Sequence, residues 1–128
     1  MSIYLTIFIS GGLCGWLIDT IYRTWQAGRF SPNTLVPFFS LIYATAAVFL
    51  YILFNSFSIS AIWHVAAGLL VVIFLEFLSG VAALIFLKRR FWDYSSNRFN
   101  LYGFVDLQHS FYWLILVSIY RVAYQLLF

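Results

Sequence analysis

Three acidic residues lie in or directly beside long apolar stretches of this sequence, at Asp19, Glu76 and Asp106. A charged side chain in the hydrocarbon region of a membrane is costly, and such residues usually face other protein groups or a wet cavity. A carboxylate there can bind a cation or exchange a proton, because protonation removes the cost of burying its charge. The predicted polar network comprises Asp19, Arg23, Glu76, Asp106 and His109.

Most of these residues also have a simpler structural interpretation. Asp19 and Arg23 are four residues apart, so an ion pair on one helix would explain both. Asp106 and His109 are equally consistent with wet residues at a membrane interface. Glu76 differs, because it lies roughly fifteen residues into its apolar stretch, too deep to reach water by extending. Its position favours either a function or a buried structural network.

Glycines recur on the same helical faces as two of these acids, at three- and four-residue spacing. Small residues let neighbouring helices approach closely, so these glycines are predicted to be helix-packing positions. They are Gly12 and Gly15 beside Asp19, and Gly68 and Gly80 beside Glu76.

The elements that must position these residues are membrane-spanning helices. Hydrophobic residues make up 64% of the 128 residues and charged residues only 9%, whereas a soluble domain carries about 25% charged residues. This composition excludes a soluble enzyme, a disordered chain and a nucleic-acid-binding module. A spanning helix takes about 20 residues, so four spans leave only short connections. We predict an all-α integral membrane protein with one domain over residues 1–128, a compact bundle of four transmembrane helices at about 3–25, 35–54, 61–87 and 102–127.

Basic residues set the predicted orientation. Six of the seven Lys and Arg residues fall in the loops after the first and third spans. Because Lys and Arg favour cytoplasmic loops, both loops are predicted to be cytoplasmic and both termini non-cytoplasmic. Arg121, near the end of the fourth span, is expected to extend outward, and His64 is expected to be an interfacial histidine. The predicted location is the cell (plasma or inner) membrane, with several passes.

Motifs of known enzyme classes are absent from the sequence. It has no H-E-x-x-H, no G-x-S-x-G, no Cys/His metal spacing and no G-x-x-x-x-G-K-[ST] phosphate loop. We therefore expect no catalytic residue, no bound metal and no cofactor. The expected surroundings are the lipid bilayer, with no nucleic-acid partner.

The loop after the third span is polar and aromatic. Trp92-Asp93-Tyr94-Ser95 is followed by Phe99-Asn100-Leu101-Tyr102-Gly103. The carboxylate of Asp93 is expected to cap a turn or a helix start. We predict that this loop closes a cytoplasmic cavity lined by the acids. The predicted loop-motif residues are Trp92, Asp93, Tyr94, Ser95, Arg98, Asn100 and Gly103.

These motifs resemble those of a known family. The stretch from Gly15 to Arg23 is similar to the family pattern G-W-x-x-[ED]-x-x-[YF]-R, and Glu76-Phe77-Leu78-Ser79-Gly80 is similar to E-[YF]-x-x-G. With W-D-Y-S, F-N-x-x-G and the S-x-x-W of Ser110-Phe111-Tyr112-Trp113, the chain resembles the small four-span CmpB-like family of ABC-transporter type IV proteins. The resemblance covers roughly residues 11–113. The family often has G-R-I-C where this chain has Gly103-Phe104-Val105-Asp106, so no role for Asp106 follows from it.

The resemblance and the deep acids predict a membrane transporter, channel or permease component that moves a small solute, with cation or proton linkage. Asp19 is expected to approach Glu76, with His109 or Arg98 supplying a hydrogen-bond donor. An ATP-driven pump would need a separate ATPase. Four short spans enclose little space, so a homo-oligomer is also expected. The alternative is a non-catalytic membrane subunit or assembly factor of a larger complex, whose polar faces pack on a partner.

Overall fold

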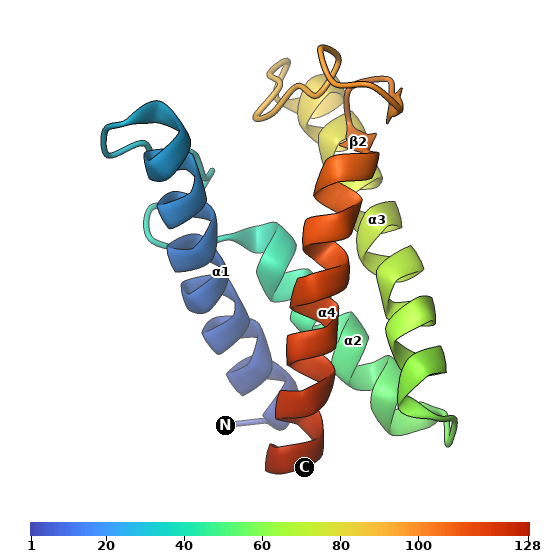
Figure 1. The fold of residues 1–128 in the computed structure, drawn as a ribbon. Helices are drawn as coiled ribbons and strands as arrows, with labels where there is room; N and C mark the ends of the chain where they lie inside the picture. The colour runs from blue at the N-terminus through green and yellow to red at the C-terminus, as the bar shows by residue number, and fades with distance from the viewer. The chain divides into compact units, whose positions relative to one another are not determined.

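The computed structural model describes all residues, 1–128, as four α-helices and one short β-hairpin (Figure 1). The elements in chain order are α1 (Ile3–Ala27), α2 (Leu41–Ser56), α3 (Ala61–Phe86), β1 (Asn100–Leu101), β2 (Val105–Asp106) and α4 (Leu107–Leu127). They form two compact units, Met1–Phe49 and Leu50–Phe128, whose boundary lies inside α2. The single domain predicted over residues 1–128 stays a prediction.

The helices are those of a membrane protein in length and composition. α1, α3 and α4 have 25, 26 and 21 residues and are apolar enough to cross a membrane. At about 1.5 Å per residue, each covers the roughly 30 Å of bilayer hydrocarbon. α2 is also apolar but has only 16 residues, which is about 24 Å. The all-α prediction is therefore confirmed, whereas the fourth span and the side on which the termini lie stay predictions.

Local signals set both ends of α1 in the first unit. Ser2 precedes the helix in an extended conformation, and its hydroxyl accepts a hydrogen bond from the N–H of Leu5 at 3.2 Å. Gly28 follows the last turn with a φ of 70°, a left-handed conformation that glycine adopts without strain. Its N–H donates to the carbonyl of Thr24 at 2.9 Å. The helix therefore ends at Ala27, close to the predicted end at residue 25.

The helix predicted from residue 35 begins only at Leu41, six residues later. Val36 precedes Pro37, a position at which the helical conformation is sterically disfavoured. Phe38 then has a φ of 61°, which a right-handed helix does not allow. Val36 and Phe39 pair as an isolated antiparallel β-bridge. Pro37 therefore lies before this helix, and the predicted start at residue 35 is wrong.

The glycine face of α1 receives the segment that leads into α2. A Cβ atom at Gly12 would collide with the ring of Phe39, and one at Gly15 would collide with Tyr43. The N–H of Ser40 also donates to the carbonyl of Gly12 at 2.9 Å. The missing side chains let the chain lie directly on the α1 backbone, as small residues do in packed membrane helices.

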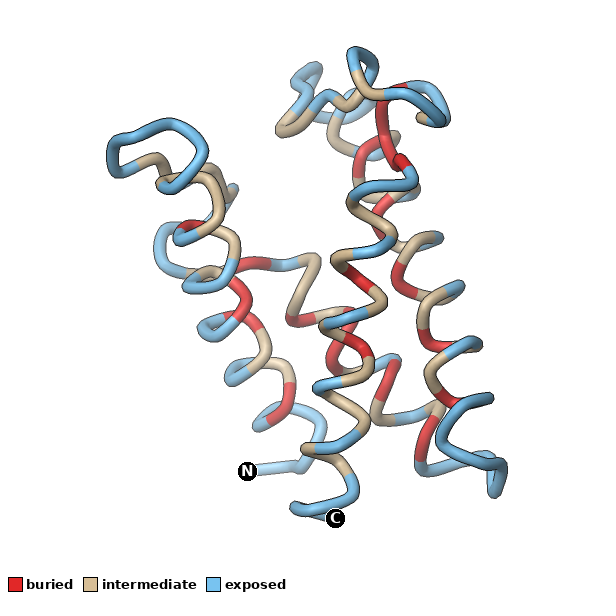
Figure 2. The backbone as a smooth tube through the Cα atoms, in the orientation of Figure 1, coloured by how far each residue is buried: buried red, intermediate tan, exposed pale blue.

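In the second unit, α3 presents one buried ridge along its length (Figure 2). Every fourth residue lies on it, namely His64, Gly68, Val72, Glu76 and Gly80. A Cβ atom at Gly68 would lie 3.0 Å from a methyl group of Val117 on α4 and 2.8 Å from Leu50 on α2. The ridge therefore packs tightly and places Glu76 inside the interface between α3 and α4.

A short hairpin precedes α4 where the sequence predicts helix from residue 102. β1 pairs antiparallel with β2. The turn between them holds Tyr102 and Gly103 at φ values of 54° and 73°, and left-handed residues cannot continue a right-handed helix. Asp106 remains extended as the N-cap, and α4 begins at Leu107, five residues later than predicted.

Candidate functional site

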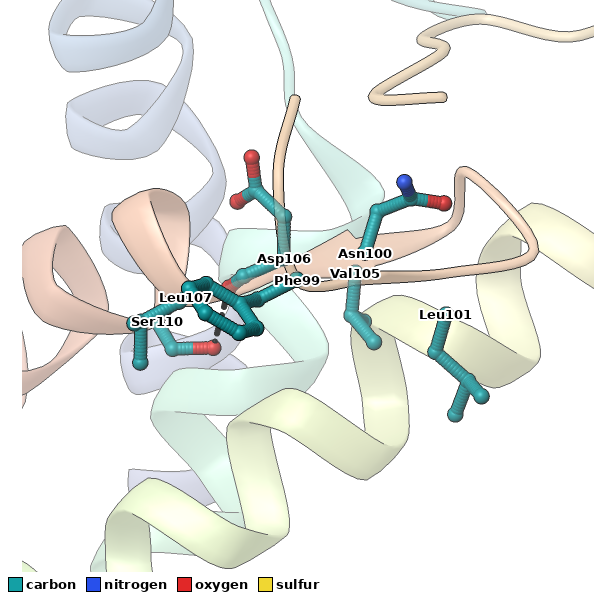
Figure 3. A pocket seen from close by; sticks show the side chains of 7 residues that line it. All are labelled: Phe99, Asn100, Leu101, Val105, Asp106, Leu107 and Ser110. Carbon is teal, nitrogen blue, oxygen red and sulfur yellow. Dashed lines mark hydrogen bonds between the residues drawn. The ribbon is translucent and has the colours of Figure 1, made fainter. Parts of the chain in front are cut away.

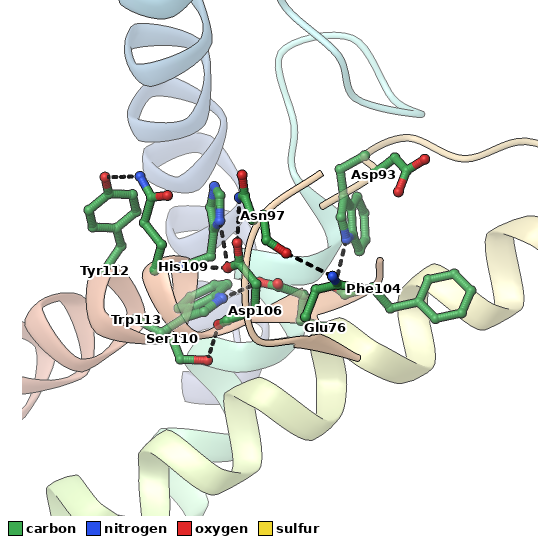
Figure 4. A network of polar contacts seen from close by, with 12 residues as sticks. Glu76, Asp93, Asn97, Phe104, Asp106, His109, Ser110, Tyr112 and Trp113 are labelled. Carbon is green, nitrogen blue, oxygen red and sulfur yellow. Dashed lines mark hydrogen bonds and ion pairs between the residues drawn. The ribbon is translucent and has the colours of Figure 1, made fainter. Parts of the chain in front are cut away.

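Glu76 is buried in the middle of α3, with only 5% of its surface exposed. The indole Nε1 of Trp113 on α4 donates a hydrogen bond to its Oε2 atom (Figure 4). An indole N–H is a donor only, so it can bond to the carboxyl group in either the charged or the protonated state. Glu76 therefore faces protein in the α3–α4 interface and not hydrocarbon.

Asp106 organises a polar cluster at the start of α4. It is 3% exposed, and its Oδ1 atom accepts hydrogen bonds from the backbone N–H and the Nδ1 atom of His109, both at 2.7 Å. Its Oδ2 atom accepts from the amide of Asn97 at 2.5 Å. An acceptor at Nδ1 of His109 fixes a proton on that nitrogen, so Nε2 is the atom of this ring that can take up a further proton.

Two tyrosines hold the His109 ring in place. The ring of Tyr94 stacks on it with centroids 3.8 Å apart and an interplanar angle of 10°. The ring of Tyr112 meets it edge-on at 5.5 Å. His109 and Trp113 are four residues apart on α4, which is about one turn and 6 Å along the axis. The polar cluster and the buried carboxylate therefore follow each other along one side of α4 (Figure 4).

Hydrogen bonds fold the loop motif onto the hairpin. The indole of Trp92 donates to the carbonyl of Phe104 at 2.8 Å, and the N–H of Tyr94 donates to the carbonyl of Gly103 at 2.9 Å. The Oδ1 atom of Asn100 accepts from the N–H of Gly103 at 3.0 Å. The structure thus brings most of the predicted loop-motif residues together at the end of α3 and α4 where the hairpin lies.

Asp93 is an exposed turn residue whose carboxylate caps the backbone, as predicted. Its Oδ1 atom accepts from the N–H of Ser95 at 3.0 Å and lies 3.7 Å from the guanidinium of Arg90. Hydrogen bonds from the side chain and backbone of Ser95, with a smaller effect of the Arg90 charge, hold the pKa of Asp93 below its usual value of 3.8. A Cβ atom at Gly103 would collide with this carboxylate, so the turn needs glycine there.

The basic residues of this loop rest on aromatic rings. The guanidinium of Arg90 lies 4.4 Å from the ring centroid of Phe104 and donates to the carbonyl of Tyr102 at 3.0 Å. The guanidinium of Arg98 is exposed and lies 4.8 Å from the centroid of Phe99. Arg98 therefore does not supply the predicted hydrogen bond to Glu76.

Packed apolar side chains flank Glu76 on both sides along the ridge. Toward the hairpin, a Cβ atom at Gly80 would lie 2.5 Å from the ring of Phe104. In the opposite direction, Val72 and Val117 are 0% and 1% exposed. The carboxylate therefore lies in a buried interface, with packed apolar groups on the side away from the hairpin.

A second polar pair lies at the other end of α3 and α4. The Nε atom of Arg121 donates to Nδ1 of His64 at 3.0 Å, and Nε2 of His64 lies 2.7 Å from the carbonyl of Phe57. A guanidinium only donates, so the imidazole proton is on Nε2 and is given to this carbonyl. Arg121 turns inward to His64 and to the ring of Phe54, 5.8 Å away, and does not extend outward as predicted. His64 is 3% exposed and lies in the first turn of α3, and its position at the membrane interface stays a prediction.

The i,i+4 ion pair predicted in the first unit is present. The Nε atom of Arg23 donates to Oδ2 of Asp19 at 2.8 Å, and both side chains are partly exposed. This ion pair explains the presence of both charged residues in α1 without a role in transport. The approach of Asp19 to Glu76 stays a prediction.

The predicted polar network omits two residues that the structure places in this site. Trp113 lies four residues after His109, so the shared face of α4 is the signal that could have identified it as the donor to Glu76. Asn97 donates to Asp106 from an irregular loop, where no periodic pattern points to it. No group of three or more His, Cys, Asp or Glu side chains is arranged to hold a metal ion.

Long apolar helices around a buried polar network define a helical integral membrane protein. The chain belongs to the CmpB family described as "Putative ABC-transporter type IV", whose model matches residues 6–128. The resemblance found in the sequence motifs is thereby confirmed over nearly the whole chain. Neither a curated protein nor a solved structure matches the chain. The family and the apolar helices support a component of membrane transport.

Proposed function

We propose that this protein is the membrane component of a transport system for a small solute, and that Glu76 couples solute movement to a proton or another cation. The observation that carries the proposal is the burial of Glu76 in the α3–α4 interface. Insertion scales put an acid at mid-span at about 2.5–3.5 kcal/mol. An apolar side chain would fill this interface without that cost, whereas a carboxyl group can change its charge during a transport cycle.

The surroundings of Glu76 suit proton exchange. Because Trp113 only donates, its hydrogen bond does not have to break when Glu76 gains or loses a proton. His109, one turn nearer the hairpin, carries a nitrogen that can take up a proton. In the proposed cycle a proton arrives at His109 and reaches Glu76 along α4, on the side predicted to be cytoplasmic.

The buried side chains of Val72 and Val117 restrict the route that a solute could take. These side chains close the interface between α3 and α4 beyond Glu76. The proposed pathway therefore runs beside these helices or between protomers of a homo-oligomer. An ATP-driven system of the kind that the family name denotes would take its energy from a separate ATPase, and the proposal assigns no catalytic step to this chain.

The same apolar layer favours one alternative function. A tightly packed interface without a path through it is also what a non-transporting membrane subunit or assembly factor would have. In that case the hydrogen bond between Trp113 and Glu76 would serve only to fix how α3 and α4 pair. The two functions differ in what the purified protein does alone.

Solute uptake by purified protein in liposomes tests the proposal. A panel of small cations and metabolites is assayed under an imposed pH gradient for the wild type, Glu76→Gln and Glu76→Asp. The control is Ser118→Ala, which removes a hydroxyl that bonds within α4 to the carbonyl of Leu114. We expect gradient-driven uptake that is lost in Glu76→Gln, partly kept in Glu76→Asp and unchanged in Ser118→Ala. A stable co-purifying partner, with no uptake of any solute, would support the subunit function instead.

A further inference from the structure

A groove of about 450 Å³ lies beside the start of α4, between the hairpin and the first helical turn (Figure 3). Apolar side chains of Phe99, Leu101 and Leu107 contribute to its lining. Asp106 and Ser110 also reach it. The groove belongs entirely to the second unit and is separate from the interface that holds Glu76.

The polar groups of the groove are engaged within the protein. The carboxylate of Asp106 accepts hydrogen bonds from Asn97 and His109. The hydroxyl of Ser110 donates to the backbone carbonyl of Asp106 at 2.6 Å, the bond drawn in Figure 3. What the groove offers to a ligand is therefore mainly apolar surface.

Two apolar residues of the groove are largely exposed. Phe99 and Leu107 are 67% and 63% exposed. Phe99 also has a φ of 57°, a left-handed conformation that is strained for a bulky residue. Strain of this kind persists only where the surrounding structure imposes it, and it is a reason to look for a function. Exposed phenyl and leucyl groups at the end of spanning helices lie at the depth of the lipid headgroups and upper acyl chains.

Basic residues outnumber acidic ones in the segment that carries this groove. Residues 87–106 contain four basic residues, Lys88, Arg89, Arg90 and Arg98, against two acids, Asp93 and the groove residue Asp106, which gives a net charge of +2. Asp93 lies beside Arg90. Arg98 has no carboxylate partner, and its guanidinium lies 4.8 Å from the ring of Phe99, which lines the groove.

We propose that this groove and Arg98 bind an anionic phospholipid of the surrounding bilayer. The lipid phosphate lies on the guanidinium of Arg98, which binds phosphate oxygens in a planar, two-pronged geometry. The glycerol and upper acyl chains lie against Phe99 and Leu107. The net positive charge of the loop selects an anionic headgroup over a zwitterionic one, as juxtamembrane basic clusters do. This inference needs the membrane location of the protein but not its transport function.

Native mass spectrometry of the purified protein in detergent tests the site. Phosphatidylglycerol and phosphatidylcholine with the same acyl chains are titrated against the wild type, Arg98→Gln and Arg98→Lys. A basic residue near a membrane surface contributes about 1 kcal/mol, so Arg98→Gln is expected to bind phosphatidylglycerol about fivefold more weakly. Arg98→Lys keeps the charge and is expected to retain most of the preference for the anionic lipid, which separates lost binding from lost folding.

The matched control is Arg29→Gln, which removes one exposed basic residue from the loop of the first unit. It is expected to bind both lipids as the wild type does. Equal weakening in Arg29→Gln and Arg98→Gln would show diffuse charge attraction and overturn the site. Equal binding of the two lipids by the wild type would also overturn it. Displacement of the lipid by the same concentration of glycerol phosphate would show a site for free phosphate compounds and not for lipid.

Discussion

The indole nitrogen of Trp113 donates a hydrogen bond to the carboxylate of Glu76 inside the interface between α3 and α4. The two residues are 37 positions apart in the sequence, and the bond joins two helices that are long enough to span a membrane. On the same ridge, Gly68 allows the close approach of Val117 on α4, and Gly80 allows that of Phe104 before β2. The pair thus supplies the buried carboxylate in the middle of α3 with a hydrogen-bond donor from α4.

Replacing Trp113 with Phe should destabilise the protein, because Glu76 loses a donor while most of the aromatic volume remains. A buried polar group that loses a hydrogen-bond partner costs about 1–3 kcal/mol. Chemical unfolding of the purified protein followed by circular dichroism measures the loss. Trp63→Phe is the control, since Trp63 is exposed on α3. Equal stability of the two variants would show that the bond contributes nothing measurable.

Sequence patterns located the helices better than the segments between them. The ends of α1 and α3 follow from the length of the apolar stretches, and Gly28 marks the C-terminal border of α1. The predicted start of α2 is too early because residues 35–40 are mostly apolar and extend the apolar stretch of the helix. In the structure Val36 and Phe39 form a β-bridge, so these residues are not helical. The hairpin was likewise predicted as helix, because its residues are largely apolar. Its turn depends on a left-handed backbone at Tyr102, which the apolar pattern does not indicate.

In the site, too, residues on regular helices were easier to predict than contacts that depend on tertiary structure. The ridge that contains Glu76 and its glycines could be read from four-residue spacing, because a helix repeats that spacing in space. Trp113 lies on a predictable face of α4, but only the packing of two helices selects it as the partner of Glu76. The inward turn of Arg121 likewise depends on tertiary contact with His64.

A side chain at Gly80 should disrupt the packing of Phe104. A Cβ atom there would lie 2.5 Å from the Phe104 ring, and overpacking of this kind costs about 1–3 kcal/mol. We expect Gly80→Leu to unfold at lower denaturant concentration than the wild type. Ala82→Leu adds the same side chain at an exposed position of α3 and should have little effect. The packing account fails if both leucine variants are as stable as the wild type.

The carboxyl group of Asp93 should titrate below pH 3.8, and Ser95→Ala should move its pKa back toward that value. The hydrogen bond from the Ser95 side chain is the largest cause of the lowered pKa, and the charge of Arg90 is a smaller one. Arg90→Gln should therefore have the weaker effect. Carbon-13 NMR of the labelled carboxyl group measures all three values. A larger shift in Arg90→Gln than in Ser95→Ala would contradict the assignment.

The lowered pKa also fixes the direction of a pH effect. Because the folded state holds the charged form of Asp93 more strongly than the unfolded state does, its contribution to stability is present above about pH 3.8. That contribution is lost as the pH falls through the lower pKa of the folded state. Asp93→Asn should lack this part of the acid sensitivity, which unfolding measured between neutral and acidic pH would reveal.

The charge bias of the loops predicts opposite sides for two serines. In a Cys14→Ser background, which removes the exposed native cysteine, Ser96→Cys should react with an impermeant thiol reagent only from the cytoplasm. Ser58→Cys should react only from the other side. Labelling of intact cells and of inverted vesicles distinguishes the two. Labelling of both positions from the same side would refute the predicted orientation.

The most direct test of the central claim is whether Glu76 exchanges a proton within the folded protein. Infrared difference spectra between two pH values report the carbonyl band of a protonated carboxyl group. We predict a band that is absent in Glu76→Gln and shifted in Trp113→Phe, because the indole bonds to that carboxyl group. Identical difference spectra for the wild type and Glu76→Gln, over the whole pH range in which both remain folded, would contradict the claim.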